Sequence, residues 1–348
     1  MSATSATATR TTTPPPPTAP SPSHGRRVVA VVLLVPVLVA LALWAFAWPA
    51  ARTAPHDLPL GVAGPTTATA QVEQRLEARE GAFEIHRYAD ESAARDAIED
   101  RTVYGAVVAT EQGPKLLTAS AASPVVAQLL QQAVTQQAGG TQVQTVDVAP
   151  APAADPRGAA LTSSVLPMAL AGIGAGAAVT LLGLRGWRAA GALVGVAVLV
   201  GAVAAAIAGS WLGVLTGNWW AEAGALGLST LAVSAAVAGL AALFGTPGIG
   251  LGAFVMMLLG NPFSGAGSAP EMLPEPVGVI GQWLPPGAGA TLLRSVSFFD
   301  GAAAAGPALT LTWWAALGLG AVILGSALQR RKAPAETVVA EREPVRAG

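Results

Sequence analysis

Residues that perform chemistry are few in this chain, and their spacing matches no catalytic or metal-binding pattern. His24, His56 and His86 are too scattered for a metal cluster, and there is no cysteine to serve as nucleophile, metal ligand or disulfide partner. Neither a P-loop nor an HExxH sequence occurs. We therefore predict that the protein is not an enzyme and has no metal site and no cofactor.

One acidic run has the residue types of a calcium site. It consists of Asp90, Glu91, Asp96, Glu99 and Asp100. The spacing is not that of an EF-hand loop, and Arg95 and Arg101 interleave the carboxylates. A solvated helix face is favoured over a calcium site.

The composition is that of a membrane protein. Of the 348 residues, 52% are hydrophobic and 11% are charged, whereas a soluble domain carries roughly 25% charged residues. The formal net charge is −1, so we expect no nucleic-acid partner. The partner indicated by the composition is the lipid bilayer.

Six uncharged runs predict transmembrane helices, because a bilayer core requires about 20 apolar residues in a helix. They cover residues 28–51, 162–184, 189–210, 223–244, 249–260 and 309–328. The fifth run is short and is expected to begin in the Thr246-Pro247 turn. For the first run, an uncleaved anchor is favoured over a cleaved signal peptide, since its apolar stretch is longer than a typical signal core.

Residues 52–157 carry most of the charge before the last third of the chain and predict a small α/β domain. Strands are expected at 58–63, 83–88, 103–109, 115–118 and 141–148, and helices at 67–80, 90–100 and 124–137, with Asp90 and Ser123 as N-caps. The predicted fold class is an α-helical polytopic membrane protein of six helices. Its extracytoplasmic α/β domain is inserted between helices 1 and 2, and residues 158–328 form a five-helix membrane domain.

Within that membrane domain, residues 261–306 are apolar but broken by proline and glycine. Short helices are expected at 277–283 and 288–299, and neither is long enough to cross a bilayer. They predict a re-entrant pair or an interfacial layer. This segment is the candidate substrate or functional surface, with an interfacial structural plug as the equal alternative. Its selected residues are Asn261, Pro262, Trp283, Pro285, Pro286, Arg294 and Asp300.

Basic residues predict the orientation of the spans. With the N-terminus inside, the cytoplasmic segments contain Arg26, Arg27, Arg185, Arg188, Arg330, Arg331 and Lys332. The short external loops then contain only Arg294. We expect a multi-pass protein of the cell membrane, with a disordered cytoplasmic tail at residues 1–27 and a second cytoplasmic tail at residues 329–348.

The predicted spans contain no ionisable residue, and Glu222 is interpreted as an interfacial charge at a membrane edge. Ion-coupled transporters usually place ionisable groups at depth, so this absence argues against a self-powered pump. The Gly172-x-Gly174-x-Gly176 pattern has no preceding strand and is assigned to helix packing rather than nucleotide binding.

Several segments resemble the permease subunits of ABC-2 type exporters. They are residues 57–63 (DLPLGVA), 90–106 (DESAARDAIEDRTVYGA), 261–270 (NPFSGAGSAP), 284–288 (LPPGA) and 299–301 (FDG). The last three are similar to an actinobacterial, YhgE/Pip-related branch of permease-like membrane proteins. The resemblance covers about residues 28–328.

This resemblance implies export of a hydrophobic, lipid-like or polymeric substrate by a homodimer that works with a separate cytoplasmic ATPase. Arg185, Trp187 and Arg188 would form the cytoplasmic coupling turn. The chain departs from the family pattern at two places, since no amphipathic helix precedes the first span and only residues 185–188 connect the second and third. The alternative is a non-transporting scaffold or receptor whose outer domain binds envelope or secretion components.

Overall fold

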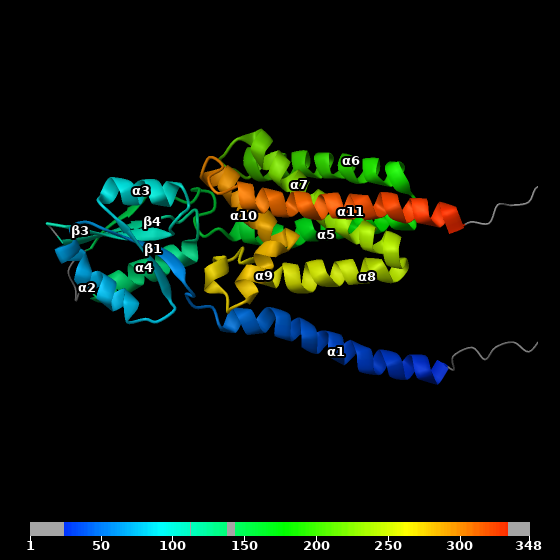
Figure 1. Cartoon of the computed structure of the whole chain (residues 1–348), viewed down its shortest axis with the longest axis horizontal. Helices are drawn as coiled ribbons and strands as arrows, with labels where there is room; N and C mark the ends of the chain where they lie inside the picture. The colour runs from blue at the N-terminus through cyan, green and yellow to red at the C-terminus, as the bar shows by residue number, and fades with distance from the viewer. Residues whose placement is uncertain (1–23, 112, 138–142, 333–348) are drawn as a thin grey trace, which may run out of the picture. The chain divides into compact units, whose positions relative to one another are not determined.

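The structure is a computed structural model that describes residues 24–111, 113–137 and 143–332. Within these residues, five helices are long and apolar enough to cross a membrane. They lie in α1 (His24–Ala51), α5 (Ala159–Leu181), α6 (Gly186–Ala205) with its π-helical extension η1 (Ala206–Trp211), α7 (Trp219–Phe244) and α11 (Ala305–Lys332) (Figure 1). The arrangement is that of a polytopic membrane protein.

The predicted fifth span is shorter than the others. It consists of α8 (Thr246–Phe254) and the π-helical η2 (Val255–Gly260), and it begins at Thr246 as expected. Residues 246–260 fall short of the roughly 20 residues that span a bilayer, so the count of six spans stays a prediction. The chain divides into two units, residues up to Trp44 and residues from Ala45, and all elements from β1 onward belong to the second.

Residues 58–147 form an α/β module with the predicted order of strands and helices. Its strands are β1 (Leu58–Ala63), β2 (Phe83–Tyr88), β3 (Gly105–Thr110), β4 (Gly113–Thr118) and β5 (Gln144–Asp147), and its helices are α2 (Thr66–Glu77), α3 (Glu91–Glu99) and α4 (Pro124–Gln137). The strand order is β2-β1-β3-β4-β5. β3 and β4 pair antiparallel, and the other neighbours pair parallel. Residues 141–142 of the last predicted strand lie outside the described residues.

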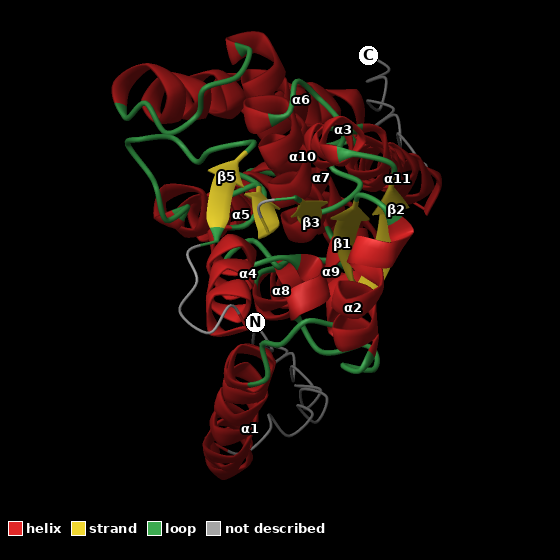
Figure 2. Cartoon of the chain, turned by 90° about the vertical axis from the view of Figure 1, so that its left-hand side faces the viewer, coloured by secondary structure: helices red, strands yellow, loops and turns green. Residues whose placement is uncertain are grey.

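Helices cover both faces of this sheet (Figure 2). Successive side chains of a strand point to opposite faces, and here both faces carry apolar side chains that need to be buried. Leu58, Leu60, Val107 and Leu116 lie in one buried cluster with residues of α2 and α4. Ala63, Ala106, Val108 and Leu117 lie in a second cluster with Ala94, Ala97 and Ile98 of α3. Each face therefore has its own hydrophobic core.

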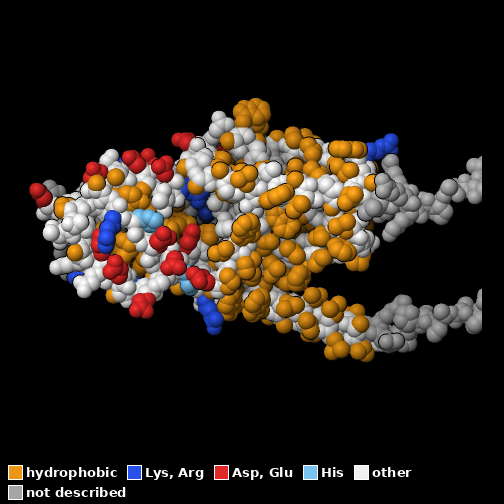
Figure 3. Space-filling model, viewed as in Figure 1, with side chains coloured by type: hydrophobic (Ala, Val, Ile, Leu, Met, Phe, Trp, Pro, Cys, Tyr) orange, Lys and Arg blue, Asp and Glu red, His pale blue; other side chains and the backbone are white. Residues whose placement is uncertain are grey.

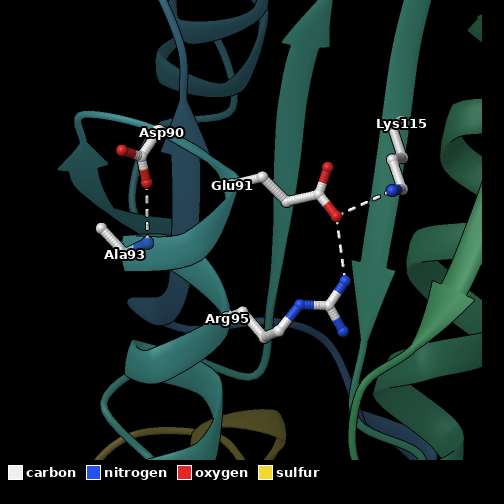
Figure 4. A network of polar contacts seen from close by, with 5 residues as sticks. All are labelled: Asp90, Glu91, Ala93, Arg95 and Lys115. Atoms are coloured by element: carbon white, nitrogen blue, oxygen red, sulfur yellow. Dashed lines mark hydrogen bonds and ion pairs between the residues drawn. The ribbon is translucent and has the colours of Figure 1, made fainter.

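The N-caps of two module helices are confirmed. Asp90 accepts a hydrogen bond through Oδ1 from the backbone N–H of Ala93, 2.9 Å away (Figure 4). Ser123 accepts one through Oγ from the N–H of Val126 at 3.2 Å. Each cap supplies an acceptor to an N–H that has no partner within its own helix.

In the helical part, α7 contacts α5, α6, α8, α10 and α11. Glycine permits its closest approach to α5: a Cβ added at Gly172 would lie 2.7 Å from Cβ of Val233, and one at Gly176 would lie 2.6 Å from the carbonyl oxygen of Ser234. Small residues allow helix backbones to approach closely. The packing role is confirmed at Gly172 and Gly176, whereas a Cβ at Gly174 would meet nothing within 4 Å.

The start of α7 corrects the sequence prediction. It begins at Trp219 rather than at residue 223, because Oδ1 of Asn218 accepts from the N–H groups of Trp220 and Ala221 at 3.0 and 3.1 Å. The span therefore contains Glu222, whose side chain is buried rather than exposed at an interface. The prediction that the spans contain no ionisable residue is wrong here.

The visible surface differs between the two parts. Over the helices it is dominated by hydrophobic side chains, and over the α/β module acidic and basic side chains are interspersed (Figure 3). Exposed apolar residues on α5, α6 and α11 include Leu170, Leu199 and Leu317. An apolar helical exterior is what contact with lipid requires.

Candidate functional site at the junction with α10

The broken segment after η2 folds into four short helices. They are the 3-10 helices η3 (Pro262–Ser264) and η4 (Pro270–Met272), followed by α9 (Val277–Trp283) and α10 (Pro285–Phe298). α9 lies where the sequence predicted it. α10 begins three residues earlier than predicted, because proline is tolerated in the first helical turn, where its missing N–H removes no helical hydrogen bond.

Two stretches of this segment pack against the α/β module. Ala269 and Met272 belong to the buried cluster on the α2/α4 face of the sheet. Phe299 belongs to the cluster on the α3 face. The module is therefore joined to the segment that contains α10 through both of its cores.

A set of polar side chains lies between these apolar contacts, and we name it the polar junction. Its members are Arg101, Tyr104, Glu271, Gln282, Thr291, Arg294 and Ser295. Arg101 follows α3 in a left-handed conformation with φ of 61°. Its Nη1 donates to the carbonyl oxygen of Thr291 at 3.2 Å and to Oγ of Ser295. Its guanidinium carbon lies 5.3 Å from the ring centroid of Phe299.

The neutral members of the junction form hydrogen bonds with their neighbours. Tyr104 donates its hydroxyl to Oε2 of Glu271 at 2.8 Å. Thr291 donates to Oε1 of Gln282 at 2.7 Å, and the amide of Gln282 donates to the carbonyl oxygen of Ser264 at 3.0 Å. Burial raises the pKa of Tyr104, so its hydroxyl remains a donor at neutral pH.

Arg294 is the buried cation of α10, with 5% of its surface exposed. Its Nη2 donates to the carbonyl oxygen of Ala266 at 3.0 Å. The sequence placed this residue on an apolar surface in an external loop, whereas the structure encloses it. Burial lowers the pKa of Arg294 to about 10, which still leaves the side chain charged at neutral pH.

The charges of the junction are unequal. Burial also lowers the pKa of Arg101, and Glu271 is the carboxylate that acts electrostatically on both arginines. Among the ion pairs of the described residues, none joins Arg101 or Arg294 to a carboxylate within 4.0 Å. The guanidinium groups of the buried Arg294 and the half-buried Arg101 thus accompany one carboxylate, and that carboxylate is hydrogen-bonded to Tyr104.

A cavity of ≈ 210 Å³ opens at the junction. Its polar lining comes from Arg101, Thr102, Tyr104, Glu271, Gln282 and Thr291. These residues come from the α/β module, η4, α9 and α10, so the cavity exists only where the module meets the broken segment. Its volume exceeds that of a single water molecule several times over.

None of the predicted site residues lines this cavity, Arg294 included. Pro285 and Pro286 are buried and line a separate, mostly apolar cavity of ≈ 50 Å³ with residues of α5 and α7. The backbone carbonyl oxygen of Asn261 accepts from Oγ of Ser264 at 2.7 Å. Pro262 begins η3. The selected set is therefore distributed over several surroundings.

Trp283 and Asp300 lie at exposed positions. The carbonyl oxygen of Trp283 accepts from Nε1 of Trp314 in α11 at 2.8 Å, and its ring is exposed. Asp300 lines a third cavity, of ≈ 800 Å³, together with Glu99 and Asp100 of the module. The acidic character of that cavity is the opposite of the charge at the polar junction.

The connection between α5 and α6 lies three residues earlier than the predicted turn at 185–188. α5 covers Ala159–Leu181 rather than residues 162–184, so residues 182–185 form the connection. α6 begins at Gly186, with Arg185 as its N-cap, so Trp187 and Arg188 lie in the first helical turn. Arg185, Trp187 and Arg188 are all exposed, and the indole of Trp187 is 77% exposed. Arg185 also borders a cavity of ≈ 210 Å³ formed by α5, α7 and α11.

Sequence reasoning found Arg294 but missed the rest of the junction. Arg101 was assigned to a solvated helix face, and the structure corrects this, since its side chain reaches the backbone of α10. One available signal was Glu271, a carboxylate between Pro270 and Pro274 in an otherwise apolar stretch. Pairing Arg101 with α10 requires the tertiary contact, because 190 residues separate it from Thr291.

The comparisons with known proteins bear on the first half of the chain. The sequence model of the ABC-2 family transporter protein family matches residues 26–176. The match covers less than half of the 348 residues and ends before the broken segment. It supports a permease-type membrane subunit, which is generally not an enzyme, and it does not confirm the YhgE/Pip-related branch. No curated protein and no solved structure matches the chain.

Proposed function

We propose that this protein is the permease subunit of an ABC-2 type exporter. It would move a hydrophobic, lipid-like or polymeric substrate out of the cell, with energy from a separate cytoplasmic ATPase. The observation that carries the proposal is the family match over residues 26–176, which include the first span, the whole α/β module and most of α5. The five candidate spans supply the membrane part that such a subunit needs.

The proposal includes an orientation and an assembly. Both termini and the turn at Arg185 would be cytoplasmic, and the α/β module would lie outside, as the distribution of basic residues predicts. The exposed side chains of Arg185, Trp187 and Arg188 would then be available to an ATPase. Two copies of the chain would form the transport unit.

The broken segment is the proposed substrate surface. One side of α10 contributes Pro286, Gly289 and Leu293 to the apolar cavity, and Thr291 of the same helix lines the polar one. A helix with an apolar cavity and a polar cavity beside it offers two environments to an amphipathic molecule. Neither α9 nor α10 is long enough to cross a bilayer, with 7 and 14 residues.

The second candidate function is a membrane scaffold or receptor. The observation that favours it is the short connection between α5, which ends at Leu181, and α6, which begins at Gly186. An ATPase would have little surface to hold at this place. In this alternative, the outer α/β module would bind envelope or secretion components.

Purification from native membranes separates the two functions. The tagged protein, extracted in mild detergent, is analysed by mass spectrometry for stoichiometric partners. The exporter proposal expects an ABC-type ATPase, and it expects the variant with Arg185→Ala and Arg188→Ala to retain less of it at equal membrane levels. Recovery of envelope or secretion proteins without an ATPase would favour the scaffold instead.

A further inference from the structure

We propose that the cavity at the polar junction is a binding site for an anionic phosphoryl group. The cavity of ≈ 210 Å³ is lined by Arg101 and lies where the α/β module meets α9 and α10. The site itself follows from the geometry of this junction. Its assignment to the transported substrate rests on the proposed export function.

The charge balance points to an anion. A buried cation without a paired carboxylate is costly, because it loses hydration without gaining an ionic partner. Arg294 is buried and Arg101 is half-buried, and neither forms an ion pair among the described residues. Glu271 is the carboxylate that acts electrostatically on both. A bound anion would supply the missing negative charge.

The hydrogen-bond inventory points the same way. The hydroxyls of Tyr104 and Thr291 already have acceptors, in Glu271 and Gln282. Arg101 uses Nη1 for both of its hydrogen bonds to α10. Among the described residues its Nε and Nη2 form no hydrogen bond, so they are the donors left for a ligand, and this fork matches phosphate oxygens in geometry.

Arg294 has a different role from Arg101. It does not line the cavity but interacts electrostatically with Arg101, Tyr104 and Glu271. Its charge adds to the positive potential at the site without touching the ligand. Glu271 lowers that potential, so the two residues have opposite effects on the affinity for an anion.

Two sources could supply the phosphoryl group, a lipid headgroup or free phosphate. The first probe is inorganic phosphate, titrated calorimetrically into the full-length protein in nonionic detergent, with sodium chloride at matched ionic strength as the control. The second probe is nanodiscs of phosphatidylcholine with and without phosphatidylglycerol, in which thermal unfolding of the same protein is followed. Phosphate binding identifies the free ion as sufficient, and stabilisation by phosphatidylglycerol alone identifies the headgroup.

Substitutions at three residues give different expected results. Arg101→Gln should weaken the binding of the effective probe by about tenfold or more, the effect of losing a charge-assisted hydrogen bond. Arg294→Gln should weaken it several-fold, and Arg294→Lys should restore most of the loss. Glu271→Gln should strengthen binding, which a purely structural role at the junction would not produce. Arg95→Gln, whose arginine is paired with Glu91 on α3, is the matched control and should bind as the wild type does.

The proposal is overturned if phosphate has no effect beyond the sodium chloride control and phosphatidylglycerol has none beyond phosphatidylcholine alone. It is also overturned if Glu271→Gln fails to strengthen binding, and this variant decides the matter even where Arg101→Gln does not fold. The export function is tested separately by the associated ATPase. Anion binding without an ATPase would contradict only the export function, and an ATPase without anion binding would contradict only this site.

Discussion

Glu222 is a buried carboxylate in the first turn of a candidate span, where 1% of its surface is exposed. Its Oε1 accepts from the backbone N–H of Gly217 at 2.9 Å. Its Oε2 faces the π-helical turn η1, since a Cβ added at Gly209 would lie 3.4 Å from it. The carboxylate thus connects the loop before α7 to α7 itself.

Glu222→Ala is predicted to destabilise this loop. The N–H of Gly217 would lose its acceptor, and an unsatisfied buried donor costs about 1–3 kcal/mol. Glu222→Gln retains an oxygen acceptor and should lie closer to the wild type. Thermal unfolding of both variants in detergent measures the difference, and equal stability of the alanine variant and the wild type would show that the hydrogen bond contributes nothing.

Glu91 is the centre of the ionic contacts on the α3 face of the module (Figure 4). Its Oε1 lies 2.7 Å from Nζ of Lys115 and 2.9 Å from Nη2 of Arg95. The hydrogen bond from Lys115 holds the pKa of Glu91 below its usual value, with a smaller contribution from Arg95. The contact joins α3 to β4 across the face of the sheet.

The depressed pKa predicts a pH dependence of stability. The folded state favours the ionised carboxylate, so the contribution is present above the unfolded pKa, near 4.5, and is lost as the pH falls through the folded pKa. Glu91→Gln should therefore destabilise the module by roughly 0.5–1 kcal/mol at pH 7 and by less at pH 3, which is below the unfolded pKa. Infrared spectroscopy of the sheet amide band during heating measures this, and an equal loss at both pH values would refute it.

Among the helices, the close contact of α5 with α7 depends on glycines, which have no side chain. Gly176→Ala would place a methyl group 2.6 Å from the carbonyl oxygen of Ser234, whereas Gly174→Ala would place one in open space. We predict a lower melting temperature for Gly176→Ala. The control Gly174→Ala should be unchanged or more stable, because alanine favours a helix over glycine by about 1 kcal/mol. Equal behaviour of the two variants would contradict the packing.

The sequence predicts elements well where local signals decide them. α3 and α4 carry their polar N-caps, and α9 matches its predicted range Val277–Trp283 because prolines flank it. Local signals mislead where the same residues can either end one helix or begin another. Pro285-Pro286-Gly287 was expected to end α9, and the same residues also begin α10. The early start of α7 was detectable from Asn218, a favoured N-cap.

The candidate site was much less predictable than the elements. Its hydrogen bonds join residues far apart in the chain, such as Tyr104 and Glu271, which are 167 positions apart. Periodicity and capping report on neighbours within a few turns and carry no information about such pairs. Arg294 was identified because a lone charge in an apolar helix is conspicuous, whereas Arg101 lies among other charged residues and gave no such signal.

For the whole molecule, the proposed topology places the α/β module and the α5–α6 turn on opposite sides of the membrane. The chain has no cysteine, so single cysteines can be introduced without first replacing native ones. Ser92→Cys on α3 and Trp187→Cys at the turn are suitable, since both residues are exposed. A membrane-impermeant maleimide should label Ser92→Cys on intact cells and Trp187→Cys only after permeabilisation. The reverse pattern would invert the topology.

The proposed exporter function depends most on coupling to an ATPase. The most direct measurement is vanadate-sensitive ATP hydrolysis by the protein purified from native membranes and placed in lipid nanodiscs. We predict hydrolysis that co-elutes with the protein and decreases in the variant with Arg185→Ala and Arg188→Ala. A preparation of intact protein without vanadate-sensitive hydrolysis would contradict the exporter function.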